Sequence, residues 1–75
     1  MRIATWNINS IRLRIQQVLR FVKEQDIDVL CLQETKTPDD YFPQNEFKTL
    51  GYENQYYRGE KSYNGVAIIS KLKFF

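Results

Sequence analysis

Residues 29–33, with the sequence Val-Leu-Cys-Leu-Gln, are apolar at four successive positions and lie between the acidic residues Asp28 and Glu34. A short apolar run of this kind is typical of a central strand that is covered on both faces. Earlier in the chain, residues 3–6, Ile-Ala-Thr-Trp, form a second β-favouring run, which the polar Asn7 ends. The sequence thus predicts two strands near its beginning.

The residues between these two runs have the period of an amphipathic helix. Ser10 is a favoured N-cap residue, and apolar side chains follow it at the spacing of one helical face. They are Ile11, Ile15, Val18, Leu19 and Val22. We therefore predict a helix from about Ser10 to Gln25. Strand, helix and strand in this order form a βαβ unit with parallel strands and a right-handed crossover, so the predicted fold class is α/β.

The second half of the chain predicts a short helix and a β-hairpin. Pro43 suits the first position of a helix with Phe47 and Leu50 as its apolar residues and Gly51 as its C-terminal cap. Residues 52–57 and 65–70 then read as two strands joined by a polar loop. Residues 71–75 look like the approach to a further element, so we expect a truncated domain.

Composition excludes several classes of site. The chain has 75 residues, no His and one Cys. Within it, an internal disulfide, an ordinary Cys/His zinc site and a Ser-His-Asp triad are therefore excluded. The apolar runs are too short for a membrane span or a signal peptide, which leads us to expect a cytoplasmic protein without a membrane partner.

Charge is distributed unevenly along the chain. The net charge is +4 over residues 1–25, −5 over residues 26–55 and +3 over residues 56–75. A polyanion would be attracted by the two ends rather than by the whole chain. The alternative is that these charges are ordinary solvated surface.

Polar side chains follow both predicted parallel strands. In open α/β sheets the ligand crevice lies outside the carboxyl ends of the strands, so Asn7 and Glu34 are expected at the same rim. Their oxygens suit Mg²⁺, and Thr35 and Lys36 add a hydroxyl and an ammonium for a phosphate. The chemistry indicated is metal-assisted phosphoryl transfer. The alternative is that Glu34 only pairs with Lys36 and Asn7 only caps a turn.

Two segments resemble a known family. Residues 5–12, Thr-Trp-Asn-Ile-Asn-Ser-Ile-Arg, and 30–36, Leu-Cys-Leu-Gln-Glu-Thr-Lys, resemble the first two signature segments of the exonuclease III family. Its members are apurinic/apyrimidinic endonucleases of the wider endonuclease/exonuclease/phosphatase superfamily. The resemblance continues through residues 39–43, 50–52 and 63–68. It implies a four-layer α/β sandwich of which residues 1–75 form the N-terminal portion, with the C-terminal remainder absent.

The resemblance assigns roles to the residues of the rim. Glu34 matches the family's metal-ligating glutamate, which holds the Mg²⁺, or Mn²⁺ as the alternative, that polarises the scissile phosphate. Asn7 matches the asparagine beside that metal. Asn9 falls where relatives often have an acidic residue. Lys36 is expected near the phosphate, and Gln33 is expected to support Glu34.

The resemblance also implies a DNA-facing surface. Arg12 and Arg14 match positions where family members contact the DNA backbone, and the alternative for each is a solvated helix face. Tyr63, Asn64 and Gly65 match a family loop that lies against DNA. The aromatic face of Tyr63 would stack on a base or sugar, or it would cover the edge of the sheet instead. We expect Trp6 to lie in the core and Cys31 to be a buried, unreactive thiol. We expect three further tyrosines to pack on a face of the sheet: Tyr52, Tyr56 and Tyr57.

The function implied is that of a Mg²⁺-dependent nuclease of base excision repair. Such an enzyme cleaves phosphodiester bonds 5′ of abasic sites and degrades duplex DNA from 3′ ends, so its partner is duplex DNA with either feature. The family's further catalytic residues cannot be placed in this chain. We therefore expect the segment to be inactive alone and to require its missing C-terminal portion. The alternatives are another superfamily phosphatase or phosphodiesterase, and a non-catalytic remnant of a split gene that binds DNA or a complementary fragment.

Overall fold

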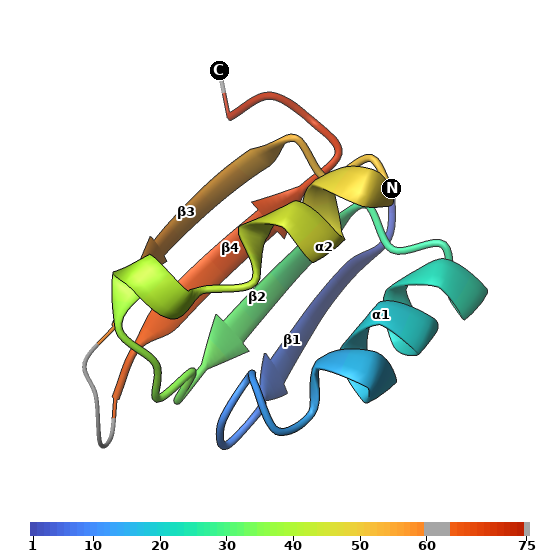
Figure 1. The fold of residues 1–75 in the computed structure, drawn as a ribbon. Coiled ribbons are helices and arrows are strands. Elements are labelled where there is room, and N and C mark those ends of the chain that lie inside the picture. Colours follow the sequence, from blue (N-terminus) through green and yellow to red (C-terminus); the bar gives the residue numbers. More distant parts are fainter. Residues whose placement is uncertain (60–63, 75) are drawn as a thin grey trace.

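Four strands form a single sheet with both α-helices on one of its faces (Figure 1). The computed structural model describes residues 1–59 and 64–74. The strands are β1 (Ile3–Asn7), β2 (Val29–Gln33), β3 (Asn54–Arg58) and β4 (Val66–Ser70). The helices are α1 (Ile15–Glu24), the short 3-10 helix η1 (Asp39–Tyr41) and α2 (Gln44–Thr49). No helix among the described residues is long and apolar enough to cross a membrane.

The strand order is β1-β2-β4-β3, so β2 is central as predicted. β1 and β2 are parallel, with Ile3 opposite Val29 and Asn7 opposite Gln33. β4 pairs antiparallel with β2 and with β3. The predicted α/β class, the βαβ unit and the β-hairpin are confirmed.

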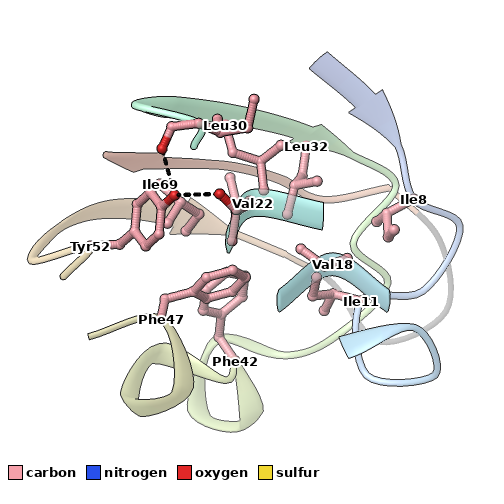
Figure 2. Packing of buried hydrophobic residues seen from close by; sticks show 12 residues of the cluster. Ile8, Ile11, Val18, Val22, Leu30, Leu32, Phe42, Phe47, Tyr52 and Ile69 are labelled. Atoms are coloured by element: carbon pink, nitrogen blue, oxygen red, sulfur yellow. Dashed lines mark hydrogen bonds between the residues drawn. The ribbon is translucent and has the colours of Figure 1, made fainter. Parts of the chain in front are cut away.

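The core lies between one face of the sheet and the two helices (Figure 2). Alternate residues of the two central strands point into it, as the period of a strand requires. From the sheet these are Leu30, Leu32, Ala67 and Ile69; from the helices and loops they are Ile8, Ile11, Val18, Val22, Ile27, Phe42, Phe47 and Tyr52. The ring of Phe42 also stacks on that of Tyr57, with 4.1 Å between centroids.

The first helix begins later than the sequence predicts. α1 starts at Ile15, and Arg14 occupies the N-cap position without a side-chain capping bond. Ser10 is not the N-cap residue. Its φ is +84°, and its backbone N–H donates to the backbone carbonyl oxygen of Glu34. The N–H of Ile11 likewise donates to the oxygen of Thr35. Residues 8–11 therefore bind the neighbouring loop instead of opening the helix.

The other face of the sheet is open within the described chain. Two of the cross-strand rows on it are Thr5, Cys31, Ile68 and Tyr56, and Asn7, Gln33, Val66 and Arg58. Ile3 is 64% exposed and Val66 is 50% exposed on this face. Cys31 is half-buried here, so the prediction that it is a buried core residue is wrong. The apolar run of β2 fits coverage on both faces, but the described residues cover only one.

Tyr52 closes the end of the core that is opposite to Asn7 and Glu34. Its side chain is 1% exposed, and its hydroxyl donates to the backbone oxygen of Ile27, near that of Val22 (Figure 2). Lys71 lies over the Tyr52 ring at 5.3 Å and bonds Asp26 at 3.1 Å. The predicted packing role of Tyr52 and Tyr57 is confirmed, whereas Tyr56 is 51% exposed on the open face.

We expect the substitution Tyr52→Phe to lower the free energy of unfolding by about 1–3 kcal/mol, because it leaves a buried carbonyl without its donor. Urea unfolding followed by circular dichroism measures this change. Tyr56→Phe is the matched control, since its side chain is exposed, and it should stay within about 0.5 kcal/mol of the wild type. Equal effects of the two substitutions would contradict the role given to the Tyr52 hydroxyl.

The same residue gives the stability a pH dependence. Burial raises the pKa of Tyr52 above 10.0, against the opposing charge of Lys71. The hydrogen bond to Asp26 raises the pKa of Lys71 above 10.5. A group whose pKa is raised on folding stabilises the fold below its unfolded pKa and ceases to do so as the pH rises through its folded pKa. The free energy of unfolding should therefore fall above about pH 10, and less steeply in Tyr52→Phe.

Candidate functional site

Asn7 and Glu34 meet at the carboxyl ends of β1 and β2. Asn7 is the last residue of β1, and Glu34 follows directly after β2. The Nδ2 atom of Asn7 donates to Oε2 of Glu34 at 2.6 Å, although 27 positions separate the two residues. Parallel pairing of the two strands produces this approach, because it carries both strand ends to the same rim. The structure thus brings together the two residues that the sequence assigns to a metal.

Lys36 and Asn9 extend this pair into a network of four polar side chains. The Nζ atom of Lys36 donates to Oδ1 of Asn9 at 2.6 Å and lies 3.7 Å from Oε1 of Glu34. The side chains of Lys36 and Glu34 are 29% and 44% exposed, so solvent and ligands reach both charges. We refer to Asn7, Asn9, Glu34 and Lys36 as the rim network. It presents a carboxylate, an ammonium and amide groups to solvent at one end of the sheet.

Backbone hydrogen bonds fix the two loops that carry the rim network. The N–H groups of Ile8, Ser10 and Ile11 donate to the backbone carbonyl oxygens of Gln33, Glu34 and Thr35, respectively, at 3.0, 2.9 and 3.0 Å. These bonds continue the pairing of β1 and β2 beyond the ends of the strands.

The same loops hold an unusual share of left-handed backbone. The described residues include six non-glycine positions with positive φ, and four of them lie here: Asn9, Ser10, Glu34 and Lys36. Such positions cost of order 1 kcal/mol each and persist where the surroundings determine them. Their concentration at one rim supports a functional origin.

A third segment joins the rim from the start of β4. The N–H of Lys36 donates to the oxygen of Asn64 at 3.0 Å, and that of Thr35 donates to the oxygen of Gly65 at 3.3 Å. Two of the residues assigned to DNA contact therefore lie beside the rim network. Tyr63, the third residue of that loop, lies outside the described residues.

A hollow of about 340 Å³ adjoins this third segment. Its lining consists of Asp39, Arg58, Gly59, Asn64, Gly65 and Val66. Arg58 brings a cation that the sequence alone does not single out. The register of the sheet would have revealed it, because Arg58 ends β3 in the same cross-strand row as Asn7.

Within the described part of the chain, the side chains of Arg12 and Arg14 form no hydrogen bond or ion pair with the rim network. The guanidinium of Arg12 lies over the ring of Tyr41 at 5.2 Å, next to a hollow of about 320 Å³ that Asp40 and Glu46 also line. Arg14 is half-buried at the start of α1. The amide of Gln33 donates to Oγ1 of Thr5 at 2.9 Å rather than to Glu34, so it supports the pairing of β1 and β2.

The carboxylate of Glu34 and the amide oxygen of Asn7 are of the kind that binds a magnesium ion. Mg²⁺ commonly binds through one or two carboxylates and keeps the rest of its shell for water and phosphate. Glu34 supplies an exposed carboxylate, and the Oδ1 atom of Asn7 is left as an acceptor while its Nδ2 holds Glu34. Residues 1–59 and 64–74 contain no cluster of three His, Cys, Asp or Glu side chains for a metal. Among these residues, Glu34 and Asn7 are the ones that could hold a metal ion, through one carboxylate and one amide oxygen.

A model of the endonuclease/exonuclease/phosphatase family matches residues 4–75. The chain belongs to this family. The exodeoxyribonuclease III of Haemophilus influenzae is 35% identical over 71 residues, covering 95% of this chain and 26% of the relative. The resemblance to exonuclease III is thus confirmed. The 75-residue chain spans between 25% and 28% of the length of three curated relatives that it matches.

Solved structures of the family agree with the fold. An AP endonuclease from Archaeoglobus fulgidus is 46% identical, with a TM-score of 0.88, and is matched over 95% of this chain and 28% of its own. A 3′ phosphatase from Neisseria, solved with a product DNA hairpin, is 41% identical with a TM-score of 0.89, covering 95% of this chain and 27% of its own. The mixed α/β fold with four strands and two helices matches part of these larger folds.

Proposed function

We propose that this family member forms the N-terminal portion of an exonuclease III-like DNA repair nuclease that depends on Mg²⁺, with Mn²⁺ as a substitute. The whole enzyme hydrolyses phosphodiester bonds 5′ of abasic sites and degrades duplex DNA from 3′ ends. The observation that carries the proposal is the 2.6 Å hydrogen bond between Asn7 and Glu34. It joins the two signature segments at the rim where an α/β sheet binds ligands.

The residues of the rim network divide the work at the scissile phosphate. Glu34 would hold the metal, and the hydrogen bond from Asn7 fixes one oxygen of its carboxylate. When bound, Mg²⁺ would stabilise the charge that develops on the phosphate oxygens. Lys36, whose Nζ atom lies 3.7 Å from Oε1 of Glu34, would add a second positive group for the same phosphate. Asn9 accepts from Lys36 and limits its motion.

The DNA backbone would follow the positive residues near the rim. Lys36, Asn64 and Gly65 lie together through the backbone bond between Lys36 and Asn64. Arg12 and Arg14, from the loop that leads into α1, belong to this proposal on sequence grounds. Tyr63 belongs to the same proposal on sequence grounds. Oligonucleotide affinity at such a surface falls with added salt.

The missing C-terminal portion of the domain is the second proposed partner. The open sheet face carries exposed apolar side chains, among them Ile3, Tyr56, Val66 and Ile68. Exposed apolar side chains on one face of a sheet are typical of a surface that another layer covers. Residues 1–75 would then supply one metal ligand and part of the DNA surface, and the remainder would supply the groups that activate water.

A phosphatase activity is the second candidate, because the relative from Neisseria is named a 3′ phosphatase. The same rim network would serve it, since both reactions need a metal beside a phosphate. A non-catalytic chain that binds DNA or a complementary fragment is the third candidate. Assays of the whole enzyme with abasic duplex and with 3′-phosphorylated duplex separate the first two.

We expect Mg²⁺ to shift the NMR signals of Asn7 and Glu34 in this chain, and Glu34→Ala to abolish that shift. The reason is that Glu34 is the carboxylate of the rim network. Glu24→Ala is the matched control, because that exposed carboxylate ends α1 away from the rim, and it should leave the titration unchanged. A wild-type titration without a response at either residue would contradict the proposed metal site.

We also expect the purified 75-residue chain to show no cleavage of an abasic duplex in the presence of Mg²⁺. The described residues offer one carboxylate at the rim and no cluster of three potential ligands, so the groups that generate and orient the attacking water are not supplied. A gel assay with a labelled duplex measures cleavage. Turnover comparable with that of an intact relative would refute this expectation.

A further inference from the structure

We propose that Gly65 is a positioning residue, which sets the geometry of Glu34 and Lys36 by allowing the start of β4 to lie directly against Thr35. This inference deepens the proposed function and rests on the metal site assigned there. Gly65 has no side chain that could bind a ligand. Its contribution is the absence of a side chain at a point where three backbone segments converge.

The packing around Gly65 leaves no room for a β-carbon. A Cβ built on Gly65 would overlap Oγ1 of Thr35, and it would lie 3.3 Å from the backbone N of Lys36 and 3.3 Å from the Cα of Gly59. The backbone φ of Gly65 is +105°, which L-residues rarely adopt. Glycine is therefore required at this position for two separate reasons.

Thr35 cannot yield without moving its neighbours. Its side chain is 1% exposed, and its backbone is bonded on both sides, to Ile11 through its oxygen and to Gly65 through its N–H. Glu34 and Lys36 flank it, both with positive φ. A shift of Thr35 therefore changes the direction of both side chains, and the bonds from Asn7 to Glu34 and from Lys36 to Asn9 depend on those directions.

A second glycine makes the same kind of contact one step further along. A Cβ on Gly59 would overlap the backbone oxygen of Thr37, which is also 1% exposed. The N–H of Gly59 donates to Oδ1 of Asp39 at 2.8 Å. Residues 35–37 are thus packed against two glycines of the hairpin. A Cβ on Gly59 would lie in ordinary contact with Oγ1 of Thr35, at 3.4 Å, whereas a Cβ on Gly65 would overlap it.

The test compares Gly65→Ala with Gly51→Ala. Gly51 is the matched control, because its φ is +96° but a Cβ there would have nothing within 4 Å. Both substitutions therefore impose a similar backbone strain, and only Gly65→Ala displaces Thr35. The first readout is the side-chain amide signal of Asn7 without metal, which reports the bond to Glu34. The second is the Mg²⁺ concentration at the midpoint of the titration.

We expect Gly65→Ala to move the Asn7 signal to its position in Glu34→Ala, and to raise the Mg²⁺ midpoint at least about tenfold. Gly51→Ala should leave both unchanged. If both variants behave alike, or if Gly65→Ala leaves the Asn7 signal in place, the proposal is overturned. A wild-type chain that ignores Mg²⁺ while Gly65→Ala still moves the Asn7 signal would refute the metal site and leave the positioning role standing.

A double variant keeps the proposal testable where Gly65→Ala alone fails to fold. Adding Thr35→Ala removes the atom that the new Cβ would overlap. The folded double variant should recover the Asn7 signal of Thr35→Ala alone. A folded double variant that lacks this signal overturns the proposal, because the contact with Thr35 would then not be the cause.

Discussion

The parallel pairing of β1 with β2 is the constraint on which the site depends. A crossover through α1 forces the two strands to run in the same direction, so their carboxyl ends lie side by side. Asn7 and Glu34 then meet, and the backbone bonds from residues 8–11 to residues 33–35 extend the contact past the sheet. The side chains of the rim network reach solvent, while the backbone N–H groups of residues 8, 10, 11, 35 and 36 are hydrogen-bonded between segments.

The two ends of the sheet carry different kinds of side chains. At the end near Tyr52, a buried phenol, a lysine and an aspartate close the core, and their pKa shifts concern stability. At the end near Glu34, positive-φ residues and exposed charges are concentrated. Stability and ligand chemistry therefore occupy opposite ends of the same four strands. This separation allows the rim residues to be substituted without disturbing the Tyr52 contact.

Sequence patterns predict the elements whose causes are local. The apolar run of residues 29–33 predicts β2 with its observed bounds, and Pro43 and Gly51 bracket α2. The convergence of Asn7 and Glu34 follows from the βαβ topology alone. The start of α1 cannot be predicted in this way, because the N–H of Ser10 donates to the backbone oxygen of Glu34, which is distant in the sequence. Likewise, four successive apolar residues in β2 do not predict on which face of the sheet Cys31 lies. The position of Arg58 near the rim follows only from the register of β3 with β4.

Native-state hydrogen exchange by NMR, amide by amide, tests the central claim most directly: that backbone bonds fix the loops carrying the rim network. The account predicts slow exchange at Ser10, Ile11 and Lys36, with protection approaching that of the neighbouring strand residues, because each N–H donates across to another segment. Rapid exchange at these three amides, alongside protected amides in β1 and β2, would contradict it. The rim would then be a set of loose loops rather than a preformed site.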